Sequence, residues 1–276
     1  MKLFVFIILF YSPNVLSIDV VYPGHERNDY VISVLKQALS YDTLGKSYQV
    51  LPHGLDMSKD RAFKLMSKGK DINIMFGSAT RERETLYLPI RFPLMRGLNG
   101  WRIALINRNK STLFESISTL DEFKLLRPGQ RDVWSDTQIL ESNNIKVIKG
   151  SNYGGLYTML HKNRFDYFPR SVLRVEQDLQ NNQQLNLMID PYVLIHYPTA
   201  YYFYVRKGDV ALAKDIKTGL EKALADGQLN KLFMEDFGNI VNRIKAQKRT
   251  VFHLNNPFLP PQTPLSRSEL WVDLAK

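Results

Sequence analysis

The stretch from Gly77 to Ile90, GSATRERETLYLPI, gathers hydroxyl and guanidinium groups directly after an apolar run. Hydroxyls, backbone N–H groups and the planar donor fork of an arginine together suit a carboxylate. Ser78, Thr80 and Arg83 are therefore candidates for a carboxylate receptor. The same stretch would equally suit a solvated turn in which arginines and glutamates compensate one another, each pair contributing little to stability. The spacing alone leaves both interpretations open.

Strand-like and helix-like segments alternate before this stretch. Residues 18–23, 47–52 and 71–76 have the apolar character of strands, and residues 28–41 and 58–69 carry apolar side chains on one helical face. This β-α-β-α-β order predicts a parallel sheet with right-handed crossovers. Because ligands bind beyond the carboxyl ends of strands in open α/β sheets, the charged stretch should lie at a cleft.

The rest of the chain repeats this alternation. Residues 100–190 predict a second lobe, followed by an aromatic strand at 199–208, a helix at 209–227 and two helical segments to about Lys248. The tail 251–276 is rich in Pro and Asn but carries apolar side chains, so it should wrap back onto a lobe. Within the second lobe, strands are predicted at 100–108, 123–130, 145–150 and 165–168, and helices at 134–144, 153–164 and 170–182.

Composition narrows the function classes. With 276 residues, 44% apolar and 23% charged, the chain is typical of a globular protein with one large domain or two lobes. The absence of cysteine excludes disulfides and thiolate chemistry. The net charge of +10 comes from dispersed Lys and Arg without a nucleic-acid-binding motif, so no nucleic-acid partner is expected. The five histidines show no metal-ligand spacing, and no phosphate-binding loop or nucleophile elbow occurs.

The N-terminus indicates export. Residues 1–17 contain one lysine, an apolar run from Leu3 to Tyr11, a polar break and a small residue at Ser17. This is the pattern of a cleavable signal peptide, and the mature chain would begin near Ile18 in the periplasm. A buried strand or an uncleaved anchor are the alternatives.

The longer stretch DINIMFGSATRERETLYLPIRFPL resembles a segment of the extracellular solute-binding proteins of family 3, the periplasmic receptors for polar amino acids. The resemblance covers nearly all of the mature chain. It implies an α/β, two-lobed periplasmic-binding-protein fold of type II, each lobe a mixed, mostly parallel sheet flanked by helices. The first lobe would comprise residues 18–99 and 200–276, and the second lobe residues 100–199.

The resemblance also implies a ligand site between the lobes. Residues at the positions of Ser78 and Arg83 hold the ligand's carboxylate in that family, and Tyr22 matches an aromatic ring against the ligand, although a core tyrosine fits equally. Residues near the two hinge crossings, such as Arg102 and Tyr201, would be structural. In the second lobe, the candidates for ligand contact are Gln130, Arg131 and Trp134.

One departure from the family bears on the ligand. Counting from Asp166, the acidic position that receives the ligand's ammonium in amino-acid-binding members falls on Ser171, beside Arg170. A cationic neighbour repels an ammonium. A carboxylate without an amine, or a more acidic compound, therefore fits better than an ordinary amino acid, with Arg170 among the residues that close over the ligand.

The resemblance implies a monomeric solute-binding protein that needs no cofactor and closes about a hinge. Its partner would be an inner-membrane permease or a sensor protein, and the sequence does not separate transport from signalling. Two alternatives stay open: a dehydratase-like enzyme of the same fold, and a structural or signalling accessory protein without a ligand.

Overall fold

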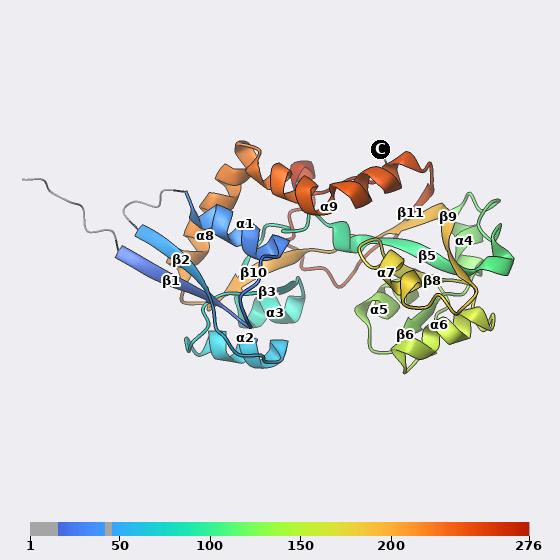
Figure 1. The fold of residues 1–276 in the computed structure, drawn as a ribbon, viewed down its shortest axis with the longest axis horizontal. Coiled ribbons are helices and arrows are strands. Elements are labelled where there is room, and N and C mark those ends of the chain that lie inside the picture. The colour runs from blue at the N-terminus through green and yellow to red at the C-terminus, as the bar shows by residue number, and fades with distance from the viewer. Residues whose placement is uncertain (1–15, 42–45, 276) are drawn as a thin grey trace, which may run out of the picture.

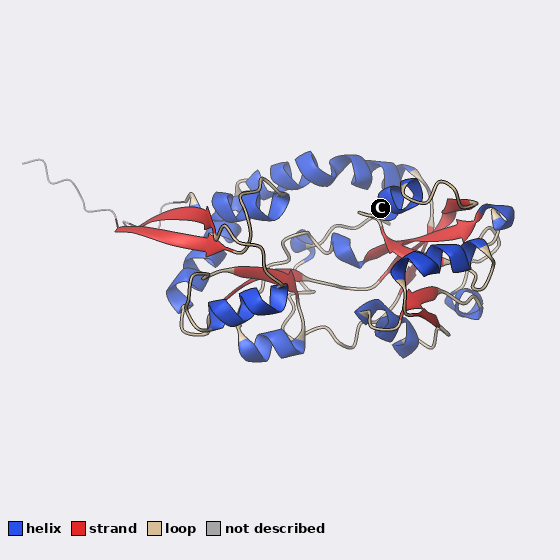
Figure 2. Cartoon of the chain, turned by 60° about the horizontal axis from the view of Figure 1, so that its bottom comes forward, coloured by secondary structure: helices blue, strands red, loops and turns tan. Residues whose placement is uncertain are grey.

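The computed structural model describes residues 16–41 and 46–275, which form two lobes lying side by side (Figure 1). Figure 2 shows the strands of each lobe as separate sheets with helices around them. The first lobe consists of β1 (Leu16–Tyr22), α1 (Tyr30–Leu39), β2 (Lys46–Pro52), α2 (Lys59–Ser67), β3 (Met75–Ser78), α3 (Arg81–Leu86), β4 (Leu88–Ile90), β10 (Tyr201–Val205) and α8 (Val210–Ala225).

Strand pairing in the first lobe is mixed. β1 and β2 are parallel, as predicted, but β3 pairs antiparallel with β10, which lies between β3 and β4. β3 also starts later than predicted, because Asp71 has a φ of 56° and the Asn73 side chain bonds the backbone of β1 at Asp19 and Val21. The Asn73 side chain thus joins this segment to β1 beside two backbone bonds from Asn73 and Ile74 to the carbonyl of Val21, and β3 itself covers Met75–Ser78.

The second lobe is built on a four-stranded sheet in the order β11-β9-β5-β8, with β6 and β7 forming a parallel pair beside it. β5 is antiparallel to both β8 and β9, and β11 is parallel to β9. Its elements are β5 (Trp101–Asn107), α4 (Leu120–Leu125), β6 (Gly129–Arg131), α5 (Ser135–Ser142), β7 (Ile148–Gly150), α6 (Tyr153–His161), β8 (Phe168–Ser171), α7 (Val175–Gln180), β9 (Leu187–His196) and β11 (Thr250–His253).

Two predictions for this lobe were wrong. The first part of the strand predicted at 123–130 belongs to helix α4, because Thr119 and Glu122 form a capping box that starts this helix. Its last two residues, Gly129 and Gln130, belong to strand β6. Phe123 of this helix is buried and stacks on Phe252 of β11, with ring centroids 4.5 Å apart. The central strand β9 has no counterpart among the predicted strands, and its pairing with β5 contains a register shift.

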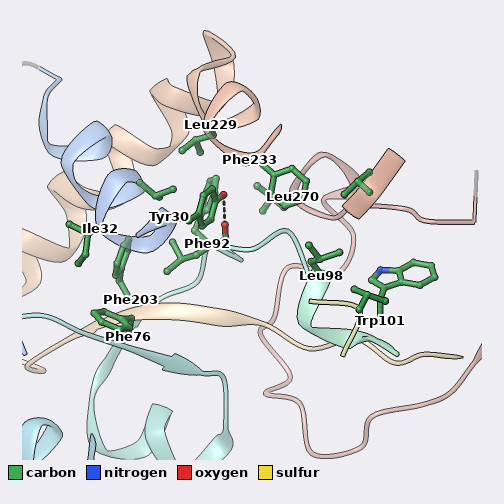
Figure 3. Packing of buried hydrophobic residues seen from close by; sticks show 14 of the residues in the cluster. Tyr30, Ile32, Phe76, Phe92, Leu98, Trp101, Phe203, Leu229, Phe233 and Leu270 are labelled. Carbon is green, nitrogen blue, oxygen red and sulfur yellow. Dashed lines mark hydrogen bonds between the residues drawn. The ribbon is translucent and has the colours of Figure 1, made fainter. Parts of the chain in front are cut away.

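A continuous apolar cluster runs through the first lobe and into the second (Figure 3). In it, Tyr30 of α1 donates a hydrogen bond of 2.7 Å to the carbonyl of Leu94, and Phe233 lies edge-on to its ring. Trp101, where the chain enters β5, belongs to the same cluster. The core therefore extends along the connection between the lobes.

The C-terminal part connects the lobes a second time. Helix α9 (Gln228–Ala246) is one continuous helix where two segments were predicted, and it runs from the first lobe toward the second (Figure 1). Its Arg243 pairs with Glu176 of α7, and β11 then joins the second lobe's sheet. This corrects the assignment of all of 200–276 to the first lobe. The tail returns, as predicted, and the backbone N–H of Val272 bonds the carbonyl of Arg96.

The predicted signal peptide lies largely outside the described residues. β1 begins at Leu16, and Leu16 and Ser17 pair with Lys46 and Ser47. Cleavage after Ser17 would therefore remove the first two residues of this strand. No helix among residues 16–41 and 46–275 is long and apolar enough to cross a membrane.

Candidate ligand-binding site

Two adjoining cavities, of about 740 and 520 Å³, lie between the lobes and form one cleft. The first lobe contributes the end of β3 and the start of α3, and the second lobe contributes β5, β8 and the start of α5. The residues common to both cavities are Ser78, Thr80, Arg102, Ser135, Asp136 and Ser171.

The first lobe's wall contains Ser78, Thr80 and Arg83, the residues from which a carboxylate receptor was predicted. Thr80 caps α3, and its hydroxyl accepts a hydrogen bond of 3.1 Å from the backbone N–H of Arg83. The guanidinium of Arg83 donates to the carbonyl of Ser78 at 2.7 Å and lies 5.3 Å from the ring of Phe63. These contacts hold hydroxyls and a guanidinium together at one edge of the cleft, as a carboxylate receptor requires.

Lys59, at the start of α2, adds a further cation to this wall. It lines the larger cavity, and its ammonium lies 5.8 Å from the ring of Tyr201. Burial lowers the pKa of Lys59, and the nearby charges of Arg83 and Arg27 lower it further. A bound anion would relieve that repulsion.

The second lobe's wall contains a buried ion pair. Arg102 of β5 contacts Asp136 of α5, with Nη2 and Oδ1 2.6 Å apart, and its Nε donates to the hydroxyl of Tyr197 at 2.7 Å. Tyr197 in turn donates to Asp136. Burial raises the pKa of Asp136, but the charge of Arg102 and these hydrogen bonds outweigh burial and hold the pKa below its usual value. Asp136 is thus ionised and already paired.

Arg170 lies at the smaller cavity, but its charge is compensated. Its Nε is 2.6 Å from a carboxylate oxygen of Asp178, and its Nη2 donates to the hydroxyl of Tyr153. Its guanidinium also lies over the rings of Trp134 and Phe168. Arg170 therefore organises this wall and contributes less net charge than an unpaired arginine would.

Gln130 offers a polar group to a ligand. It lines the smaller cavity, is 1% exposed, and donates weakly to the carbonyl of Pro169 at 3.4 Å. Its Oε1 has no hydrogen-bond partner among the described residues. A buried amide oxygen without a partner is costly, so this group is suited to receive a donor from a ligand.

Six of the eight predicted site residues line the cleft: Ser78, Thr80, Arg83, Gln130, Trp134 and Arg170. Tyr22 does not, because it is 1% exposed and packed in the first lobe's core. Arg131 also lies outside the cavity linings, where its carbonyl accepts a bond from Thr137. Arg102 and Tyr201, for which structural roles were predicted, line the cleft.

The described residues that line the cleft are strongly cationic. They include six cations against one acid, Asp136, which is paired with Arg102. No group of three or more His, Asp or Glu within the described part of the chain could hold a metal ion. The six cations are Lys59, Arg81, Arg83, Arg102, Arg170 and Arg174.

No protein-family model and no curated protein matches the sequence, but solved structures match the fold. A probable amino-acid ABC transporter extracellular-binding protein from Bacillus subtilis is 16% identical, with a TM-score of 0.52, over 80% of this chain and 97% of that chain. The L-cystine solute receptor of Neisseria gonorrhoeae, in its unliganded open conformation, is 16% identical, with a TM-score of 0.51, over 82% and 94%.

A third match is the second substrate-binding domain of a putative amino acid ABC transporter from Streptococcus pneumoniae. It is 14% identical, with a TM-score of 0.52, over 77% of this chain and 96% of that chain. Together these matches show that the chain has the two-lobed α/β fold of periplasmic solute-binding proteins. The predicted fold is therefore confirmed.

Proposed function

We propose that this protein is an exported solute-binding protein that captures a small, amine-free carboxylate in the cleft between its lobes. Ser78, Thr80 and Arg83 hold the anionic group from the first lobe, and Gln130, Trp134 and Arg170 close over it from the second lobe. Residues 18–99 belong to the first lobe and 100–199 to the second, with a hinge where the chain crosses between them. Lobe closure then buries the ligand.

The charge of the cleft carries this proposal. Of the six lining cations, Arg102 and Arg170 are paired with Asp136 and Asp178. The other four attract an anion, whereas an α-ammonium group needs an unpaired carboxylate nearby. The one acid of the described lining, Asp136, is already bonded to Arg102 and Tyr197. An ordinary amino acid would bring its ammonium into a positive field without a free counter-charge.

The fold supports a role in transport or signalling rather than catalysis. The neighbours with this fold include parts of amino-acid ABC transporters and a solute receptor. By analogy, the ligand-bound form would be presented to an inner-membrane permease or a sensor protein from the periplasmic side. The proposed ligand class rests instead on the charge of this chain's own cleft, and it differs from the amino acids named for those neighbours.

A thermal-shift experiment with matched ligand pairs tests the proposal. Succinate and aspartate differ only by an amine, and pyruvate carries a keto group at the carbon where alanine carries an ammonium. Because a ligand that binds only the folded state stabilises it by mass action, by about 2.7 kcal/mol at a hundred times its Kd, binding raises the melting temperature. The amine-free member of a pair should give the larger shift.

Arg83→Ala should abolish the shift caused by the carboxylate and leave the melting temperature of the free protein nearly unchanged. Arg206→Ala is the matched control, since Arg206 pairs with Asp209 at the surface. Larger shifts with aspartate or alanine would overturn the amine-free ligand class. If chromatography shows that the protein converts a bound ligand into another compound, the protein is an enzyme and the proposed binding role is wrong.

A further inference from the structure

The C-terminal tail crosses the cleft. We name residues 255–259, which follow β11, the C-terminal strap. At the second lobe, Asn143 and Asn255 exchange two hydrogen bonds, of 2.7 and 2.9 Å. At the first lobe, Arg81 of α3 donates to the carbonyl of Pro257 at 2.9 Å. The strap is thus attached to both lobes while the chain returns from the second lobe to the first (Figure 1).

The middle of the strap is fixed between these attachments. The side chain of Asn256 donates to the carbonyl of Pro198 at the crossing between β9 and β10, at 2.9 Å. Its Oδ1 accepts a bond of 3.1 Å from the backbone N–H of Phe258. Such a local side-chain turn holds the backbone of Phe258 in one conformation.

The strap residues Asn256, Phe258 and Leu259 line the larger cavity of the cleft. Leu259 is 9% exposed, whereas Phe258 is 45% exposed although its backbone is held in place. If Phe258 served only to attach the strap to the lobes, its ring would be expected to be buried in one of them. Phe258 instead presents apolar surface to a cavity that also contains cations.

Other apolar side chains lie around the same cavity and extend the surface of Phe258. They come from both lobes, so an apolar group placed there would contact the strap and both walls at once. Water would be displaced from apolar surface on all sides, which is the favourable part of such binding. The larger aliphatic side chains that line this cavity are those of Val31, Met95, Ile139 and Leu173, together with Leu259 of the strap.

We propose that the C-terminal strap is a wall of the ligand site, and that Phe258 selects carboxylates carrying an apolar group. The inference rests on the proposed function, because it assigns the second half of the ligand whose carboxylate the first lobe holds. The anionic head lies at Ser78 and Thr80, where the two cavities meet, and the apolar group points along the larger cavity toward Phe258.

Calorimetric titration of the full chain with three matched pairs of carboxylates tests this assignment: acetate and phenylacetate, pyruvate and phenylpyruvate, succinate and benzylsuccinate. In each pair the head is shared and only an aromatic group is added. Burial of that group should tighten binding by about tenfold in at least one pair. Phe258→Ala should remove the advantage and leave the Kd of the smaller member within about twofold.

Two further variants sharpen the result. Phe258→Leu retains an apolar contact and should recover part of the advantage of the aromatic member. Leu265→Ala removes an apolar residue of the same tail that is 51% exposed and lies outside the cavity lining, so it should change neither Kd. An equal loss in Leu265→Ala would mean that the tail acts only through general stability, and would overturn the selection by Phe258.

The outcomes separate this inference from the proposed function. If the smaller carboxylates bind but the aromatic members bind no tighter, the strap does not select the ligand, and the proposed function stands. Selection by the strap is also overturned if Phe258→Ala still binds the aromatic member of a pair as much more tightly than the smaller member as the native protein does. If no carboxylate of either kind binds, the proposed function fails and this inference fails with it.

Discussion

Arg102 of β5 and Asp136 of α5 lie in contact at the cleft, with Nη2 and Oδ1 2.6 Å apart, although 34 residues separate them in the chain. Tyr197, at the end of β9, bonds to both. The contact neutralises the one acid that the described cleft lining contains. It therefore leaves the described cleft lining without an unpaired carboxylate.

Asp136→Asn should destabilise the protein and strengthen its binding of carboxylates. The variant leaves the charge of Arg102 largely buried without its counter-ion, which should cost about 2–3 kcal/mol of unfolding free energy. It also frees that charge for a ligand. Denaturant unfolding and titration with succinate measure the two effects. Asp209→Asn, which breaks the exposed pair with Arg206, should cost less than about 1 kcal/mol. Weaker succinate binding in Asp136→Asn would contradict this role.

Lys59 should make anion binding depend on pH. Its pKa is lowered in the free protein by burial and by Arg83 and Arg27, and a bound anion should raise it. Between those two pKa values binding takes up a proton, so affinity for an anion should fall as pH rises through that interval. Titration calorimetry in buffers of different ionisation enthalpy counts the proton.

Lys59→Gln should lose this proton uptake, whereas Lys64→Gln, an exposed lysine on the same helix, should keep it. If Lys59→Gln takes up as many protons on anion binding as the native protein does, another group is responsible for the pH dependence.

The contact between His196 of β9 and His253 of β11 should make the fold sensitive to acid. Their Nδ1 atoms are 3.1 Å apart, and His196 also stacks on Trp101. Burial, and then the charge of His253, lower the pKa of His196 to about 4, while Asp273 opposes this. The unfolded chain binds this proton more tightly than the folded protein does. The free energy of unfolding should therefore be unaffected by His196 above about pH 6.5 and should fall between that pH and pH 4, by at most about 3 kcal/mol.

Denaturant unfolding at a series of pH values measures this slope. His196→Gln should flatten it, even if the variant is less stable at neutral pH. His25→Gln should retain it, because His25 is an exposed residue that pairs with Asp56 at the surface. A slope that persists in His196→Gln would assign the acid sensitivity to other groups.

Gly219 allows helices α1 and α8 to approach closely. A Cβ at this position would lie 1.7 Å from the carbonyl oxygen of Ala38, which belongs to the rigid backbone of α1. Gly219→Ala should therefore force the helices apart and cost about 3 kcal/mol or more. Gly208→Ala is the control, since its Cβ would meet nothing within 4 Å, and its melting temperature should stay near that of the native protein.

Local signals predicted the elements whose structure is decided within a few residues. Asp29 caps α1 and Ser58 caps α2, each through a side-chain bond to the backbone N–H three residues later. β9 shows the limit of such signals. It contains Pro191 and the buried Asp190, neither of which is typical of a central strand, and its place in the sheet comes from pairing with β5 and β11.

In the candidate site, too, some residues could be predicted from local sequence and others could not. Ser78, Thr80 and Arg83 were predictable because they follow a strand end, where an α/β sheet exposes its ligand site. The strap was not, since nothing near Phe258 in the sequence indicates that it lines the same cavity as Ser78. The prediction for Tyr22 was wrong because an aromatic residue after the first strand gives the same local sequence pattern whether it packs in a core or contacts a ligand.

By itself, the sequence determined most of the alternation of strands and helices, the caps of α1 and α2, and the grouping of hydroxyls and a guanidinium after β3, because periodicity and capping act over a few residues. Only the tertiary structure decided the partners that are far apart in the chain. It paired Asp136 with Arg102, placed β11 in the second lobe and brought Phe258 to the cleft. Each of those contacts forms between groups that are desolvated together when the lobes pack, and the path of the whole chain decides which groups those are.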